Sequence, residues 1–177
     1  MAQAKERPRD LVCVLVPEVI GVGSAQAVIV QEIPLSKERD IAAIGVEDLG
    51  CEVTVERCTP CSGKVFIQAL VRKTVAFRSE VSHGVIGHAT IQTPIHTYAE
   101  VPEALPSDYC IVEEAAVDDS CSFHEPLNPN GDGTFTALVD RTLVRIVIKV
   151  VRPTQLTIPI IPCSDICPSL KDLNNRR

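Results

Sequence analysis

The residues of this 177-residue chain that are best suited to chemistry are its eight cysteines. Cysteine sulfur forms disulfides, binds zinc as a thiolate or, in a Cys-x-x-Cys motif, exchanges electrons. Cys58-x2-Cys61 and Cys163-x3-Cys167 could together supply four thiolate ligands to a zinc ion. The second pair lies in a proline-flanked tail and not in a hairpin. We therefore favour disulfides or free thiols, and we expect neither a metal nor a cofactor.

The positions of the cysteines are more informative than their number, since sequence alone does not determine how they pair. Some lie in the terminal segments, where they could meet a neighbouring chain, and these are candidates for inter-subunit disulfides: Cys13, Cys163 and Cys167. The others are candidates for further disulfides: Cys51, Cys58, Cys61, Cys110 and Cys121. A redox Cys-x-x-Cys normally opens a helix, whereas Cys58 is expected to lie between strands, so thioredoxin-like chemistry is disfavoured.

Other chemical motifs in the chain are incomplete. The segment from Asn128 to Gly133 resembles a calcium loop, but its twelfth position is Val139 instead of a bidentate glutamate, so a hairpin turn is the better interpretation. The paired acids Glu113-Glu114 and Asp118-Asp119 are adjacent, and neighbouring strand residues point to opposite faces. No nucleophile elbow is present. The sequence therefore predicts a protein that is not an enzyme.

The elements that must position the cysteines are expected to be β-strands. The stretch from Gly63 to Pro102 indicates two long strands joined by a polar turn. The first strand alternates with period two, which is typical of a strand with one face on a core. Its polar face includes Gln68, Arg72 and Thr74. Its apolar face consists of Val65, Ile67, Ala69, Val71 and Val75.

Further strands follow the same pattern. We expect them at Cys51–Arg57, at Tyr109–Val117 and at Thr136–Val151, with Pro153 ending the last one and an irregular segment over Cys121–Phe135. About eight strands in all predict an all-β fold, either a β-sandwich or a jelly roll. The inward residues of the last strand are expected to be Thr142, Val144, Ile146, Ile148 and Val150.

The two ends of the chain are expected to differ from its body. Residues 1–24 form an N-terminal arm, residues 25–153 the sandwich domain, and residues 154–177 an extended C-terminal tail. Leu11–Val22 is apolar and contains Pro17, which removes a backbone donor and so predicts an edge strand or a free arm, with a hinge at Gly21–Ser24. An apolar arm must fold back on its own domain or join a neighbour's sheet by strand addition.

Composition excludes several partners. The net charge is −6, whereas binding phosphate needs a basic face, so we expect no nucleic acid. No apolar run approaches the roughly 20 residues of a membrane helix, so we expect no membrane partner. The apolar run near the N-terminus opens after Asp10 and is interrupted at Pro17, so we expect no signal peptide.

Two segments resemble a known family. The run Gly63–Phe77 and the run His88–Ile111, with its Thr93-Pro94-Ile95 and Val101-Pro102-Glu103-Ala104, are similar to the SPOCS domain of SipL-like spore-coat and exosporium proteins. The resemblance covers residues 28–152 and leaves both arms out. It implies a β-sandwich that self-associates or docks partners on the spore surface, and it implies no catalytic residues. The cysteine-bearing arms also resemble, in layout, those of jelly-roll spore-appendage subunits.

These observations lead to one preferred hypothesis and two alternatives. The preferred one is a self-assembling structural subunit of a spore-surface layer or extracellular filament, made in the mother-cell cytoplasm and joined by strand addition and inter-subunit disulfides. Its partners would be further copies of itself and other spore-coat proteins. The first alternative is a non-polymerising module that recruits another coat protein. The second is a zinc protein using the cysteines at 58, 61, 163 and 167.

Overall fold

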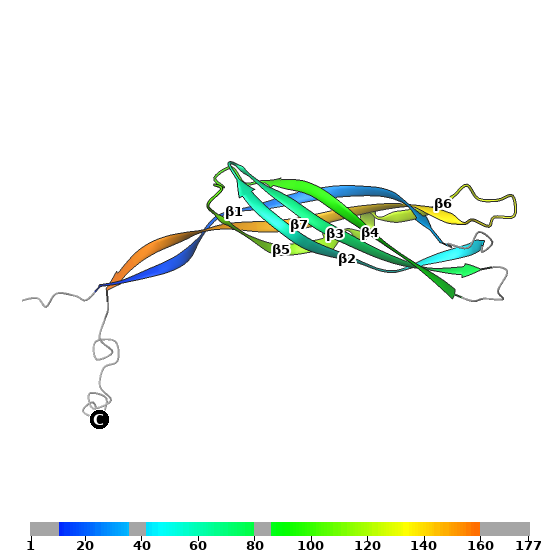
Figure 1. Ribbon diagram of the computed structural model, residues 1–177, viewed down its shortest axis with the longest axis horizontal. Helices are drawn as coiled ribbons and strands as arrows, with labels where there is room; N and C mark the ends of the chain where they lie inside the picture. The colour runs from blue at the N-terminus through cyan, green and yellow to red at the C-terminus, as the bar shows by residue number, and fades with distance from the viewer. Residues whose placement is uncertain (1–10, 36–41, 80–85, 160–177) are drawn as a thin grey trace, which may run out of the picture. The chain divides into compact units, whose positions relative to one another are not determined.

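The computed structural model describes residues 11–35, 42–79 and 86–159, and within them the chain is nearly all β. The expected all-β class is therefore confirmed, with seven strands and a single 3-10 turn, η1, among the described residues (Figure 1). The strands are β1 (Leu11–Pro34), β2 (Ala43–Cys61), β3 (Lys64–Ser79), β4 (Ile86–Glu100), β5 (Tyr109–Val117), β6 (Phe123–Leu127) and β7 (Ala137–Pro159), and η1 (Asp119–Cys121) lies between β5 and β6.

The described chain divides into two compact units. Val19–Arg152 forms one, and the terminal segments on either side of it form the other. The longest strands, β1 and β7, contribute residues to both units. The sequence placed the ends of the sandwich domain at residues 25 and 153, and the structural division falls six residues earlier at its start and one earlier at its end.

One sheet of the Val19–Arg152 unit is an antiparallel meander in the order β2-β3-β4. The central strand β3 alternates as the sequence predicts: Val65, Ala69 and Val75 are buried without measurable exposure. The turn between β2 and β3 is shorter than expected. Cys58 and Cys61 both lie within β2 and pair with Ile67 and Lys64, so the turn contains only Ser62 and Gly63, which adopts φ 75°.

The other sheet has the order β1-β7-β5, with β6 also paired to β7. β5 pairs with Val144–Val151 and β6 pairs with Ala137–Arg141. The two short strands therefore lie one after the other along the length of β7, with η1 between them in the chain. The prediction that residues 121–135 are irregular was wrong for β6. This strand pairs on β7 despite Pro126, which an edge strand tolerates.

Two sequence-based expectations about the long strands need correction. Pro153 does not end β7, which continues to Pro159. β5 pairs with β7 only as far as Val151. Pro153 therefore lies beyond the last β5 residue on that side of β7, where its missing N–H removes no hydrogen bond to β5. Gly21 and Gly23 are not a hinge but lie inside β1, where an added Cβ on Gly23 would come within 2.8 Å of Val101. These glycines allow close packing.

The inward faces of the two sheets form two apolar clusters. All five inward residues predicted for the last strand are buried. The first cluster contains Ala25, Ile29, Val65, Ile67, Ala69, Val71, Ile95, Ala99, Val101, Ala104, Val144, Ile146, Ile148 and Val150. The second contains Ile33, Leu35, Ala43, Val75, Phe77, Phe135 and Leu138.

Candidate functional site

The first candidate site is the ribbon formed by Leu11–Glu18 of β1 and Pro153–Pro159 of β7, which we call the terminal ribbon (Figure 1). The two strands are hydrogen-bonded neighbours. The Sγ of Cys13 lies 3.8 Å from Oγ1 of Thr157, and Oγ1 of Thr154 donates a hydrogen bond of 2.7 Å to Oε2 of Glu18. The contacts cross in opposite chain directions, so the ribbon is antiparallel. The terminal segments, expected as separate arms, thus pair with each other.

The terminal ribbon carries apolar side chains that the described residues leave uncovered. Leu15 is 74% exposed. An isolated two-stranded ribbon is at best marginally stable in water, and a cluster of exposed apolar side chains marks an interaction surface. The exposed apolar residues of the ribbon are Leu11, Val12, Val14, Leu15, Leu156 and Ile158.

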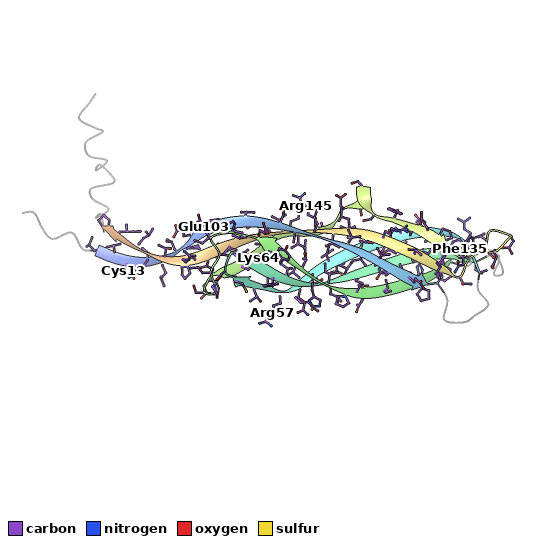
Figure 2. The ribbon with its side chains drawn as sticks, turned by 90° about the horizontal axis from the view of Figure 1, so that it is seen from above. Cys13, Arg57, Lys64, Glu103, Phe135 and Arg145 are labelled. Atoms are coloured by element: carbon purple, nitrogen blue, oxygen red, sulfur yellow. A yellow bond between two sulfur atoms is a disulfide. The ribbon has the colours of Figure 1, made fainter. Side chains whose placement is uncertain are left out.

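The structure distributes the candidate cysteines among different environments. Cys13 is an exposed free thiol on the terminal ribbon (Figure 2). Cys163 and Cys167 lie outside the described residues. Cys121 belongs to η1, and its side chain is not among those described. Of the candidates for inter-subunit disulfides, Cys13 is therefore the one whose surroundings are known.

A disulfide joins the two sheets of the sandwich. It links Cys58 of β2 to Cys110 of β5, with their Cα atoms 6.0 Å apart. Cys51 and Cys61 are half-buried free thiols. A cysteine in a disulfide supplies no thiolate, so the zinc alternative loses Cys58 as a ligand. Within the described part of the chain, no group of three or more potential ligands could hold a metal ion.

A second candidate site lies inside the sandwich, where charged and polar side chains from both sheets meet. We call Gln31, Lys73, Thr93, Asp140 and Thr142 the interior cluster. Nζ of Lys73 donates a hydrogen bond of 2.6 Å to Oδ1 of Asp140, and these side chains are 2% and 0% exposed. Thr142 donates to Oδ2 of Asp140 at 2.9 Å, and Gln31 Nε2 donates to the same oxygen at 3.1 Å. Thr93 in turn donates to Oε1 of Gln31.

The interior cluster separates the two apolar clusters. Along β3, Lys73 lies between Val71 of the first cluster and Val75 of the second. Along β1, Gln31 lies in the same way between Ile29 and Ile33. The cluster is therefore a polar layer across the core. Sequence reasoning missed it, although Lys73 occupies an inward position of the alternation that it identified.

A second carboxyl group, that of Asp48, contacts Lys73 at the edge of the interior cluster. Asp48 of β2 places Oδ2 3.0 Å from Nζ of Lys73 and is 44% exposed. Burial lowers the pKa of Lys73, but the hydrogen bonds and charges of Asp140 and Asp48 outweigh burial and raise it overall. Burial also raises the pKa of the nearby Cys51 thiol, against the opposing charge of Lys73. The lysine is thus held as an ammonium between two carboxylates.

Comparison with known proteins adds no relative. No protein-family model, no curated protein and no solved structure matches the chain. In residues 11–35, 42–79 and 86–159, no helix has the length and hydrophobicity to cross a membrane. The two sites described above are therefore interpreted from their own geometry.

Proposed function

We propose that the chain is a self-assembling structural subunit of a bacterial spore-surface layer or extracellular filament. The observation that supports this best is the terminal ribbon, which exposes apolar side chains to solvent. A second molecule bound to the ribbon would bury these side chains, and this burial is favourable. The spore surface is suggested by the resemblance of Gly63–Phe77 and His88–Ile111 to the SPOCS domain. Other spore-coat proteins are then possible partners beside further copies of the chain.

The proposed mode of assembly is strand addition at the edges of the terminal ribbon. β1 pairs with β7 on one side, and β5 leaves β7 at Val151, so among the described strands each ribbon strand keeps one unpaired edge. Unpaired edges with apolar side chains are templates for another strand. The exposed thiol of Cys13 could then form a disulfide with a neighbouring subunit once the mother cell no longer keeps thiols reduced.

Electron microscopy and gel electrophoresis of the purified full-length protein test this proposal. We expect fibres or sheets in the microscope, and disulfide-linked multimers on non-reducing gels that collapse to one band with reductant. A monomeric mass in solution, together with a band that reductant does not change, would contradict the proposal. A defined small complex with another coat protein, without polymers, would instead support the alternative of a binding module.

A further inference from the structure

The interior cluster places an amine and a carboxyl group in contact within an apolar core. Lys73 is on β3 of one sheet and Asp140 is on β7 of the other, and their hydrogen bond is 2.6 Å long. Replacing such a buried ion pair by apolar residues is often neutral or stabilising. The pair is therefore not explained by stability alone.

We propose that Lys73 and Asp140 condense to an intramolecular isopeptide bond that joins the two sheets. Nζ of Lys73 attacks Cγ of Asp140, which lies one carbon–oxygen bond beyond the contacted Oδ1. The new bond is Nζ–Cγ, the broken bond is Cγ–Oδ1, and Oδ1 leaves as water. An ammonium and a carboxylate thus give an amide and one water molecule. The step consumes no proton overall, oxidises and reduces nothing, and needs no co-reactant.

Asp48 is placed to move the protons of this reaction. Its Oδ2 lies 3.0 Å from the attacking nitrogen. It can accept a proton from Nζ and return it to the departing Oδ1, which is the role of a general base followed by a general acid. Asp48 also lines a surface cleft that reaches Lys73, so the released water has a path out of the core.

The second carboxyl oxygen of Asp140, Oδ2, has hydrogen-bond donors that can stabilise the negative charge formed during the reaction. Oδ2 accepts hydrogen bonds from Gln31 Nε2 and from Thr142 Oγ1. Two fixed donors aimed at one oxygen stabilise the negative charge of a tetrahedral intermediate. Thr93 holds the amide of Gln31 by donating to its Oε1. The two oxygens of Asp140 therefore have separate roles: one leaves, and the other becomes the carbonyl of the new amide.

Attack requires an uncharged amine. Burial favours that form of Lys73, although the hydrogen bonds and charges of Asp140 and Asp48 raise its pKa overall. Transfer of one proton along the contact between Nζ and Oδ1 produces the uncharged pair without moving any heavy atom far. Because the two carboxylates hold the lysine mainly as an ammonium, we expect condensation to be a slow step that follows folding.

Mass spectrometry of the full chain, denatured and fully reduced, tests the proposal. We expect a mass lower than that of the sequence by one water molecule. Trypsin would fail to cleave after Lys73, and the peptide Lys73–Arg78 would remain attached to the peptide that ends at Arg141. The ion pair of Lys149 and Glu113 is an internal control. Its side chains are 30% and 43% exposed, so it lacks the buried surroundings of Lys73 and Asp140 and should remain uncondensed.

Three variants separate the proposed roles. Lys73→Arg keeps the charge but cannot form the amide, so its full sequence mass is expected. Asp140→Asn can form the same amide by releasing ammonia and should give the same final mass as the wild type. Asp48→Asn keeps both reacting groups but removes the proton relay, and it should slow condensation by about 100-fold.

The wild-type measurement decides the proposal even if a variant fails to fold. A folded wild-type chain with its full sequence mass and normal cleavage after Lys73 would overturn the isopeptide bond. An unchanged rate in Asp48→Asn would overturn the relay. The isopeptide bond does not depend on assembly, because it lies within one chain and is measured on denatured protein.

Discussion

Asp108 shows how one side chain fastens the loop after β4 to the central strand β7. Its carboxylate accepts hydrogen bonds from Nε of Arg152 at 2.7 Å and from the backbone N–H of Leu105 at 2.9 Å. The hydrogen bonds from Arg152 contribute most to holding the pKa of Asp108 below its ordinary value of 3.8. The carboxylate therefore stabilises the folded state wherever it is ionised.

The pH dependence of unfolding tests the role of Asp108. A lowered pKa means that its contribution is present above the ordinary value of 3.8 and is lost as the pH falls through the lower, folded-state pKa. We expect Asp108→Asn to be less stable than the wild type at pH 7 and the difference to shrink in acid, measured by urea unfolding across pH. Glu125→Gln is the control, because its ion pair with Arg141 is exposed and should matter little. Equal effects of the two changes at pH 7 would argue against this role.

The exposed thiol of Cys13 gives a second prediction at the residue scale. Cys13→Ser should remove disulfide-linked multimers from non-reducing gels or sharply reduce them, because Cys13 lies on the terminal ribbon. Cys61→Ser is the matched control, since this free thiol is half-buried and lies in the sandwich. Multimers that persist in Cys13→Ser to the wild-type extent would assign the inter-subunit bond to other cysteines.

At the scale of elements, the long strand β1 carries two kinds of exposed apolar residue. Leu15 lies on the terminal ribbon, whereas Val28, with 70% exposure, lies on the part of β1 in the Val19–Arg152 unit. If the ribbon is the assembly surface, Leu15→Glu should abolish fibres or sheets in the electron microscope, because a charge is costly to bury in the contact. Val28→Glu should assemble normally. Equal loss in both variants would place the contact elsewhere on β1 or indicate misfolding, which circular dichroism would reveal.

The faces of β3 and β7 could be predicted from the sequence because alternation is a local property. The interior cluster could not be recognised from the sequence. Lys73 is one polar residue among apolar inward residues of β3, and its contact with Asp140 forms only when β7 packs against β3. β6 was missed because Pro126 and the adjacent Asn and Gly suggest a loop. The pairing of the terminal segments was not predicted, because the alternation of apolar and polar residues within a strand does not indicate which distant strand it pairs with.

At the scale of the whole molecule, the disulfide between Cys58 and Cys110 closes one side of the sandwich. It bridges the edge strand β2 to the edge strand β5 and spans 52 residues of sequence. Such a cross-link restricts the unfolded chain, and its removal typically costs about 2–5 kcal/mol. Its pairing could not be read from the sequence, although both cysteines were candidates.

Replacing both bridge cysteines measures this contribution directly. The double variant Cys58→Ser and Cys110→Ser should lower the free energy of unfolding by about 2–5 kcal/mol. Cys51→Ser, which alters a free thiol on the same strand, should have a much smaller effect. Both are measured by denaturant unfolding without reductant, and a reduced wild type should match the double variant. A reductant-insensitive wild type would contradict a stabilising bridge.

The central position of β7 has a consequence for synthesis. β7 is translated after the other described strands, yet it lies in the middle of its sheet and supplies half of the terminal ribbon. A nascent chain still on the ribosome can form the β2-β3-β4 meander, but neither the second sheet nor the ribbon. Truncated translation products would therefore lack the proposed joining surface, and polymer growth would be restricted to finished copies.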